Sequence, residues 1–279
     1  MSNGSPLATP QPWDLVAPAY EQEVMPMFET FAREALRLAE PPPGSRIVDV
    51  ACGPGTLSRI AARAGHTVDA LDFSPRMIEL LQAQIASEQL HITPRIGDGQ
   101  ALPYPDRTFA AAFSMFGLMF FPDRARGFAE LARVLAPGAR AVVSSWQPLE
   151  TNPALAVMFA ALRDVMSAIA PAMPGGGAPG GGAQEMPLVT DEACRAEMSA
   201  SFDDVTVRLV EHRVDYPSTQ AMWESIVRTM APITLLKHRL GDRFGEVDRR
   251  VLAAMTDQLG AGAGALTMRA WLTVGTARP

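Results

Sequence analysis

Short apolar runs alternate with longer amphipathic segments through the first half of the chain. The apolar runs have the length of buried strands, and the amphipathic segments repeat their apolar residues at helical spacing. The predicted strands are Arg46–Val50, Thr67–Leu71, Ile92–Ile96, Thr108–Phe113 and Ala139–Trp146, and the predicted helices are Thr56–Ala64, Pro75–Ser87 and Asp123–Leu135. This alternation predicts an α/β fold in which a doubly wound, mostly parallel sheet carries helices on both faces.

The segments on either side of this region are mainly helical. One or two helices are predicted over Trp13–Ala39, with interruptions near Pro18 and Pro26. The later pattern predicts helices at Pro153–Ala170, Thr190–Ser199, Ser218–Met230 and Ile233–Leu259, and strands at Phe202–Tyr216 and Leu266–Thr276. We expect the two final strands to form an antiparallel pair at one sheet edge, which completes seven strands. The helices between them would form a cap over one end of the sheet.

The composition narrows the classes of function. The 279 residues carry a net charge of −6, and an acidic chain without a Lys/Arg stripe is a poor partner for nucleic acid. Cys52 and Cys194 stand far apart without metal-ligand companions, which predicts neither a disulfide framework nor a metal site. The N-terminus lacks the pattern of a signal peptide, and the longest apolar run, Ala110–Phe121, is too short for a membrane span. We therefore expect a cytoplasmic protein.

Candidate chemistry begins at the end of the first predicted strand. Asp49 lies in this strand, and the loop after it carries Gly53 and Gly55, which allow a ligand to approach the backbone at a helix start. A dinucleotide fingerprint requires a third glycine three residues later, where this chain has Ser58. The departure counts against NAD.

Two carboxylates follow at the ends of the next two strands. Asp72 ends the second strand, where a carboxylate can accept hydrogen bonds from both hydroxyls of a ribose. Asp98 follows the third strand, where it can accept a hydrogen bond from the exocyclic amine of adenine while the amide of Gly99 faces a ring nitrogen. NAD and S-adenosylmethionine both contain a ribose, so Asp72 alone does not separate them.

The order of these motifs resembles the class I S-adenosylmethionine-dependent methyltransferases. The likeness is closest to the small-molecule branch that includes the C-methyltransferases of quinone biosynthesis (type 11). The similar segments are WDLVAPAYE (13–21), VDVACGPG (48–55), ALDFSPRMI (70–78), GDGQALPYPDRTF (97–109), SMFGLMFFPD (114–123) and FAELARVLAPGARAVVSSW (128–146). The resemblance implies a Rossmann-like fold and S-adenosyl-L-methionine as cofactor.

The same resemblance implies roles for residues at the matching positions. Gly53, Gly55, Ser114 and Met115 would line the methionine part of the cofactor, Asp49 would reach its amino group, and Tyr20 would lie over its carboxylate. Asp72 would hold the ribose, Phe73 and Met77 would lie beside the adenine or sugar, and Asp98 and Gly99 would fix the adenine.

The implied activity is direct transfer of the sulfonium methyl to a small hydrophobic molecule. The expected segments are a disordered N-terminus (1–12), N-terminal helices (13–44), a cofactor-binding core (45–150), a helix with a mobile Gly/Pro-rich loop (151–200), and the C-terminal strands (201–279). The helical cap (217–262) would be inserted between these strands as part of the same domain. We hypothesise that its methionines form a hydrophobic pocket and that the loop 175–182 gates the site.

Other interpretations of the same residues remain open. Asp49 is equally suited to bracing the turn, whereas a tyrosine such as Tyr20 is more often a packing residue than a ligand, and Cys52 is interpreted as a small loop filler rather than a nucleophile. No residue is predicted as a catalytic base. A protein that binds the cofactor without transferring its methyl, as a pericyclase does, is an alternative function, and a nicotinamide-dependent oxidoreductase is a weaker one.

Overall fold

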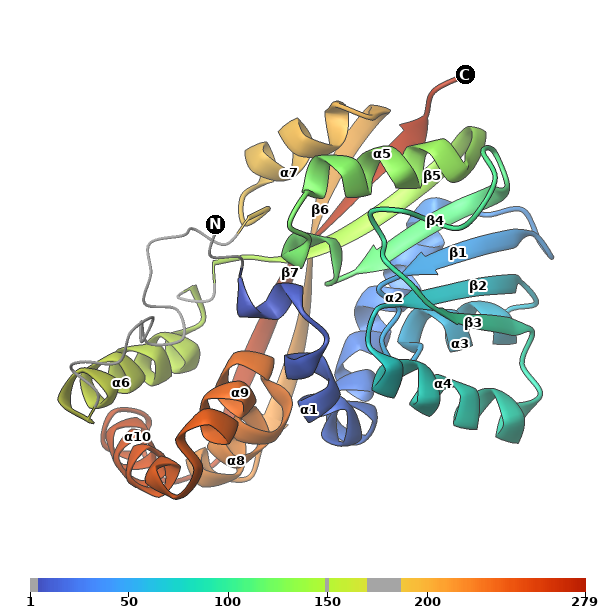
Figure 1. Cartoon of the computed structure of the whole chain (residues 1–279). Coiled ribbons are helices and arrows are strands. Elements are labelled where there is room, and N and C mark those ends of the chain that lie inside the picture. Colours follow the sequence, from blue (N-terminus) through green and yellow to red (C-terminus); the bar gives the residue numbers. More distant parts are fainter. Residues whose placement is uncertain (1–4, 149–150, 170–186) are drawn as a thin grey trace. The chain divides into compact units, whose positions relative to one another are not determined.

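A computed structural model describes residues 5–148, 151–169 and 187–279 (Figure 1). Within these residues, seven strands form one sheet in the order β3-β2-β1-β4-β5-β7-β6. The strands are β1 (Arg46–Val50), β2 (Thr67–Asp72), β3 (Ile92–Ile96), β4 (Phe109–Met115), β5 (Leu135–Trp146), β6 (Phe202–Tyr216) and β7 (Gly264–Ala277). The pairs from β3 to β5 are parallel, whereas β7 runs antiparallel to β5. The predicted mostly parallel α/β sheet is confirmed.

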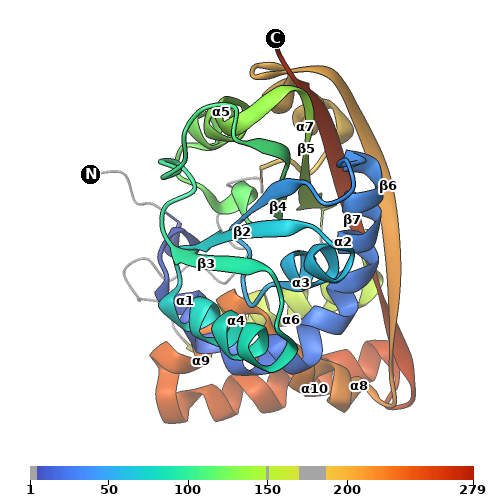
Figure 2. The ribbon, with the colours of Figure 1, turned by 90° about the vertical axis from the view of Figure 1, so that its right-hand side faces the viewer.

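Helices cover both faces of this sheet. The chain moves outward from β1 to β3 on one side and from β4 to β5 on the other, so right-handed crossovers place the connecting helices on opposite faces. Helices α3 and α4 accordingly pack on β2 and β3, and α5 packs on β4 and β5 (Figure 2). The helices of this region are α1 (Gln11–Ala19), α2 (Met25–Ala39), α3 (Thr56–Arg63), α4 (Pro75–Glu88), α5 (Arg124–Val134) and α7 (Asp191–Ser199).

Side-chain caps fix several helix starts as the sequence predicts. The Ser74 hydroxyl accepts a hydrogen bond from the Met77 amide at 3.1 Å, and Asp123 accepts one from Arg126 at 3.0 Å. Thr190 caps α7 in the same way, through the amide of Ala193. Each cap satisfies an amide that has no partner inside its helix.

Three element boundaries differ from the prediction. The segment 6–8 forms a 3-10 turn and α1 begins at Gln11, where disorder is predicted up to residue 12. Strand β5 begins at Leu135, and a shift of register opposite Phe109 accommodates 136–139, where a helix stop and a loop are predicted. The predicted helix 233–259 is divided by a 3-10 turn at Gly241–Arg243.

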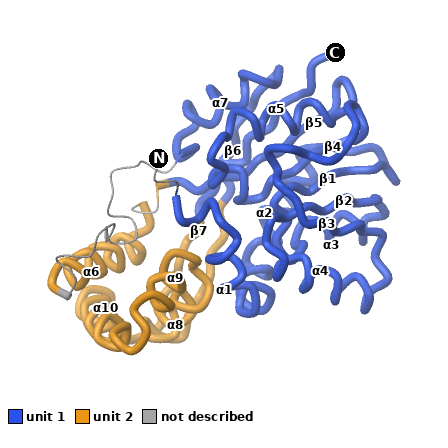
Figure 3. The backbone as a smooth tube through the Cα atoms, in the orientation of Figure 1, with its two compact units in different colours: residues 1–147, 187–210, 269–279 blue, residues 148–186, 211–268 orange. Residues whose placement is uncertain are grey.

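The chain forms two compact units, each with its own core (Figure 3). The first consists of 1–147, 187–210 and 269–279, and the second of 148–186 and 211–268. The second contains α6 (Pro153–Ile169), α8 (Thr219–Thr229), α9 (Ala231–Leu240) and α10 (Phe244–Leu259). The predicted gate at 175–182 lies outside the described residues.

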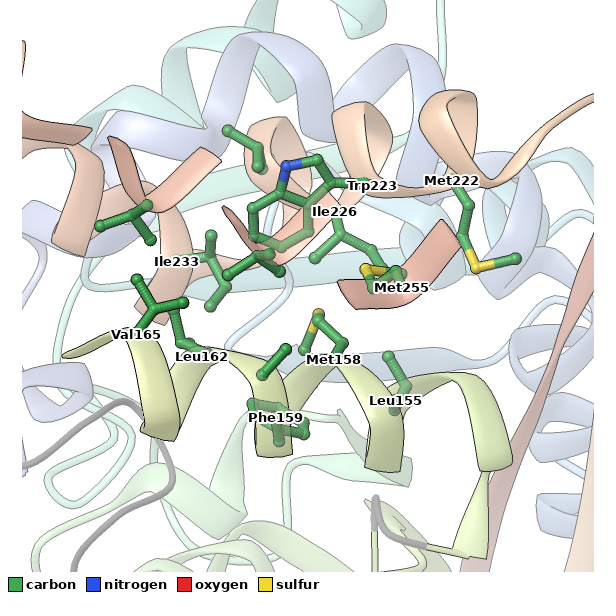
Figure 4. Packing of buried hydrophobic residues seen from close by; sticks show 14 of the residues in the cluster. Leu155, Met158, Phe159, Leu162, Val165, Met222, Trp223, Ile226, Ile233 and Met255 are labelled. Carbon is green, nitrogen blue, oxygen red and sulfur yellow. The ribbon is translucent and has the colours of Figure 1, made fainter. Parts of the chain in front are cut away.

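The second unit is held together by a cluster of buried apolar side chains. Figure 4 shows Met158 and Leu162 of α6 pointing toward α8, which contributes the fully buried Trp223. Met222 and Met255 are also packed in this cluster, so these methionines act here as core residues rather than as the walls of an open pocket. None of the helices in the described ranges combines the length and apolar character that a bilayer span requires.

Candidate cofactor site

The loop between β1 and α3 forms one side of the candidate site. Gly53 and Gly55 have φ angles of +56° and +89°, so the backbone turns sharply before α3 begins at Thr56. A Cβ at Gly55 would come within 2.5 Å of the Leu81 side chain, so no larger residue fits without movement. The turn leaves the first amides of α3 at the carboxyl edge of the sheet, where helix N-termini favour anionic or polar ligand groups.

Asp72 joins this loop to the end of β2. Its Oδ2 accepts a hydrogen bond from the Gly53 amide at 2.8 Å, and its Oδ1 accepts one from the Ser74 amide at 2.8 Å. Burial raises the pKa of Asp72 to about 6, and the two amide hydrogen bonds counteract part of that increase. Asp72 therefore orients the glycine loop at the edge where the ribose is predicted to bind.

Asp49 is the most isolated carboxylate of the site. It is 1% exposed, and its Oδ2 accepts a 2.6 Å hydrogen bond from the Ser58 hydroxyl on α3. Its Oδ1 is buried and has no hydrogen-bond partner among the described residues. Burial raises the pKa of Asp49 to about 7, and the charge of Asp72 adds to the increase.

A cavity of about 30 Å³ lies against these groups. The residues that line it come from the N-terminal helices, the β1–α3 loop, α3 and the end of β4. They are Tyr20, Phe28, Ala32, Asp49, Ala51, Cys52, Gly53, Thr56, Leu57, Met115 and Phe116. Four residues that the sequence analysis placed at the methionine part of a cofactor, Tyr20, Asp49, Gly53 and Met115, thus meet at one cavity.

Two side chains of this lining hold their protons at neutral pH. Burial raises the pKa of the Tyr20 phenol, and so does the negative charge of Asp72. Burial also raises the pKa of the Cys52 thiol well above its ordinary value, because a thiolate would be desolvated there. A protonated thiol without a base is a poor nucleophile, which agrees with the loop-filling interpretation of Cys52.

The other predicted residues lie outside the cavity lining. The Ser114 hydroxyl accepts a hydrogen bond from the Leu118 amide at 3.1 Å and so braces the turn after β4. Met77 is buried within α4, and Phe73, which follows Asp72 in the sequence, is half-buried. Asp98 is exposed, and the Gln100 amide donates to it at 2.9 Å. Their contacts with a cofactor stay predictions.

Gly99 lies where a side chain would close the end of the site. A Cβ at this position would come within 2.4 Å of the Phe121 ring and 2.8 Å of a Val50 methyl group. The close packing brings the backbone after β3 against β1, as the predicted adenine contact requires. It is also compatible with a purely structural need for glycine.

A group of packed aromatic side chains, Phe28, Phe116 and Trp146, forms a wall beside the cavity and was not predicted from the sequence. Phe116 stacks on Trp146 with ring centroids 3.9 Å apart, and Phe28 contacts Phe116 at 4.6 Å. Phe116 has a φ of +59°, an uncommon conformation for a bulky residue, and the Ser144 hydroxyl accepts a hydrogen bond from its amide at 2.8 Å. The sequence contains no local signal for this conformation.

Ser58 and Asp14 are also additions from the structure. Ser58 stands out in the sequence as a missing glycine, whereas the structure gives it a hydrogen bond to Asp49. Asp14 of α1 accepts a 2.5 Å hydrogen bond from the Ser74 hydroxyl, which ties the N-terminal helix to the loop after β2. Ser58 follows Asp49 by nine positions on the buried face of α3, and that position is the only signal that the sequence offered.

The raised pKa values of Asp49 and Asp72 predict that stability decreases as the pH increases from about 4 to about 7. Asp49 and Asp72 bind protons more tightly in the folded state than in the unfolded chain, so their contribution is complete below about pH 4 and is lost between about pH 4 and 7. We expect a loss on the order of a few kcal/mol in urea unfolding of the ligand-free protein over this range.

Asp49→Asn should reduce this pH dependence, because only the contribution of Asp72 then remains. The lowered pKa values of Glu88 and Glu130 make stability increase with pH, but only in the acidic range in which these two carboxylates titrate. Equal slopes for wild type and Asp49→Asn between pH 5 and 8 would show that Asp49 does not titrate in this range.

The comparisons with known proteins agree with this geometry. The profile of the methyltransferase domain family matches residues 47–138. An uncharacterized protein of Mycobacterium tuberculosis is 39% identical over 104 residues, which cover 37% of this chain and 38% of that protein. Demethylmenaquinone methyltransferase of Corynebacterium kroppenstedtii is 38% identical over 116 residues, or 41% of this chain and 48% of that enzyme. The matches thus span less than half the length of these relatives.

The fold is similar over a longer range. The crystal structure of the [4+2]-cyclase SpnF superposes with a TM-score of 0.60 at 17% identity, covering 99% of this chain and 100% of that one. At such low identity the likeness concerns the fold alone. Together with the motif order, these findings confirm the family resemblance. Residues 47–138 match the methyltransferase domain family, and the chain is similar to the class I S-adenosylmethionine-dependent methyltransferases, with a particular resemblance to those of quinone biosynthesis.

Proposed function

We propose that this protein transfers a methyl group from S-adenosyl-L-methionine to a small hydrophobic molecule by direct displacement. The observation that carries the proposal is the cavity at the carboxyl edge of the sheet, where Tyr20, Asp49, Gly53 and Met115 meet. These residues come from three separate parts of the chain, the N-terminal segment, the end of β1 with its glycine loop, and the end of β4, and the family resemblance implies that all four contact the same cofactor. When bound, the cofactor would supply an activated methyl group.

The donor set of the site fits this cofactor. Asp49 presents a buried oxygen without a partner, which suits the ammonium group of an amino acid. Asp72 would hold the sugar, and Asp98 and Gly99 would hold the purine. A cavity of about 30 Å³ corresponds to the volume of roughly one water molecule. Tyr20 and Phe28 would therefore have to shift when a larger group enters.

The aromatic wall supports a hydrophobic acceptor. Phe28 and Phe116 line the cavity, with Trp146 stacked on Phe116, and aromatic rings pack well against planar ring systems. The similar enzyme from Corynebacterium kroppenstedtii is named for demethylmenaquinone. We therefore place phenols and quinols first among the acceptors, with terpenoids next.

The side chains of the site contribute by orientation and by excluding water. Correct alignment of two reactants accounts for ~7–11 kcal/mol of a barrier in favourable cases, so a dedicated base is not required. Tyr20 keeps its proton because burial raises its pKa, so it can donate a hydrogen bond but is not a base at neutral pH. We assign no catalytic base.

Calorimetry and a transfer assay test the proposal together. We expect the purified protein to bind S-adenosylhomocysteine and to transfer labelled methyl to at least one member of a panel of lipophilic phenols, quinols and terpenoids. Tighter binding of NADH than of S-adenosylhomocysteine would favour an oxidoreductase instead. Tight binding of S-adenosylhomocysteine with no transfer to any acceptor would favour a cofactor-binding protein that transfers nothing, as in the pericyclase alternative.

A further inference from the structure

Asp49 is held by one hydrogen bond that leaves half of its carboxylate available. The Ser58 hydroxyl donates to Oδ2 at 2.6 Å, and both residues are almost completely buried, at 1% exposure for Asp49 and 0% for Ser58. The bond fixes the plane of the carboxylate because Ser58 lies in the first turns of α3, which is anchored in the core by Leu57 and Ala61. Oδ1 has no partner in the described structure, and Asp49 lines the cavity.

The electrostatic surroundings of this oxygen favour a cation. The titratable side chains around Asp49 are Asp72 at the end of β2, Cys52 in the glycine loop and Tyr20 from the N-terminal segment. The cavity lining in the described residues contains no lysine, arginine or histidine. An ionised Asp49 is therefore compensated by the Ser58 hydroxyl and, more weakly, by the Ser58 backbone amide, and a proton or a cationic group must supply the rest.

We propose that Ser58 is a positioning residue that directs Asp49 Oδ1 toward the ammonium group of the bound cofactor, and that binding at this oxygen expels a proton from the protein. The inference depends on the proposed function, because it takes S-adenosylmethionine and its product as the ligands. In the ligand-free protein, part of the population carries a proton on Asp49. The ammonium group replaces that proton, which leaves for solvent, and the carboxylate becomes ionised.

Ser58 determines how readily the exchange occurs. Its hydrogen bond stabilises the ionised carboxylate and counteracts the increase in pKa that burial causes. Without the hydroxyl, the buried carboxylate would keep only the weaker interaction with the Ser58 backbone amide, so Asp49 would keep its proton to higher pH. The ligand would then have to displace a more tightly held proton, and its affinity at neutral pH would fall.

Calorimetry of the intact protein at pH 7 tests this coupling. S-adenosylhomocysteine is titrated in two buffers with different ionisation enthalpies, so that the difference in heat reports the protons released. The matched ligand is 5′-methylthioadenosine, which keeps the adenine and ribose but lacks the amino acid. Asp72 faces the ribose of both ligands, so its own titration contributes equally and the difference isolates Asp49.

We expect wild type to release a fraction of a proton with S-adenosylhomocysteine beyond that seen with 5′-methylthioadenosine. Asp49→Asn should remove this excess. Ser58→Ala should weaken the binding of S-adenosylhomocysteine about 10- to 100-fold at pH 7, which is the effect of one charge-assisted hydrogen bond. The loss of affinity should be smaller above pH 8. The affinity of Ser58→Ala for 5′-methylthioadenosine should match wild type.

Two further variants keep the test independent of folding. Ser58→Thr retains the hydroxyl and should restore the wild-type proton release. Ser145→Ala removes another buried hydroxyl, whose hydrogen bond to the Leu188 carbonyl lies outside the cavity lining, and should leave both ligands unaffected. Equal heats in both buffers for wild type, or the same affinity in Ser58→Ala at every pH, would overturn the inference while the function stands. A wild type that binds neither ligand would refute the proposed function itself.

Discussion

Replacement of Asp72 by alanine is expected to weaken the binding of S-adenosylhomocysteine by at least ~100-fold. The carboxylate has two roles in this expectation: it would accept the ribose hydroxyls, and it already holds the Gly53 and Ser74 amides at 2.8 Å. Hydrogen bonds to a charged group contribute ~1.5–3 kcal/mol each, and every ~1.4 kcal/mol corresponds to a factor of ten in affinity. Loss of the sugar contacts alone would give the predicted effect.

Isothermal titration of wild type, Asp72→Ala and Asp72→Asn measures this effect. Asparagine retains the shape and one acceptor oxygen, so Asp72→Asn should lie between the other two. The matched control is Asp69→Asn, a buried carboxylate on the same strand that is paired with Arg46 rather than with the glycine loop. An Asp72→Ala variant that folds and binds with wild-type affinity would remove Asp72 from the cofactor site.

The sequence predicted the sheet well because its signals are local. Each core strand is a short apolar run, and residues such as Ser74 and Thr190 mark helix starts through their own hydrogen bonds. The edge strand β6 was found because Phe202–Tyr216 alternates apolar and polar residues. The start of β5 was predicted too late, because Pro137-Gly138 is typical of the end of a helix followed by a loop. In the structure, these two residues lie within β5, at the shift of register opposite β4.

Pro26 in the N-terminal segment shows how a helix can continue past a proline at which the sequence predicts an interruption. Pro26 has no amide proton, so it cannot make the usual bond to the carbonyl four residues earlier. Tyr20–Val24 adopts the wider π-helical turn instead, and the Met25 amide donates to the Tyr20 carbonyl. The helix therefore continues through the predicted interruption, and this turn sets the position of Tyr20. Such turns are frequent at functional sites.

The details of the candidate site were harder to predict because they depend on contacts between distant segments. Phe28, Phe116 and Trp146 come from α2, the end of β4 and β5, and no local pattern indicates that they stack. The hydrogen bond from Ser74 to Asp14 joins residues sixty positions apart. Single residues such as Asp49 and Gly53 were accessible through motif spacing, whereas their partners became visible only in the folded chain.

Replacement of Trp223 by alanine is expected to destabilise the second unit by ~3–5 kcal/mol, the usual loss when a buried tryptophan is truncated. Trp223 is fully buried in the cluster of α6, α8, α9 and α10 (Figure 4). Its indole nitrogen donates to Asp248 Oδ1 at 2.8 Å, so truncation leaves both a cavity and a carboxylate without that donor. Trp223→Phe keeps an aromatic ring and should lose about half as much.

Urea unfolding monitored by circular dichroism measures this loss, and titration with S-adenosylhomocysteine measures its consequence for binding. All described residues of the candidate site belong to the first unit, so affinity should stay within about twofold of wild type under native conditions. Trp271→Ala is the matched control, because its indole also donates at 2.8 Å, to the Val189 carbonyl, but within the first unit. If Trp223→Ala unfolds at the wild-type urea concentration, this cluster is not what stabilises the second unit. Abolished binding with a folded first unit would contradict the expected affinity.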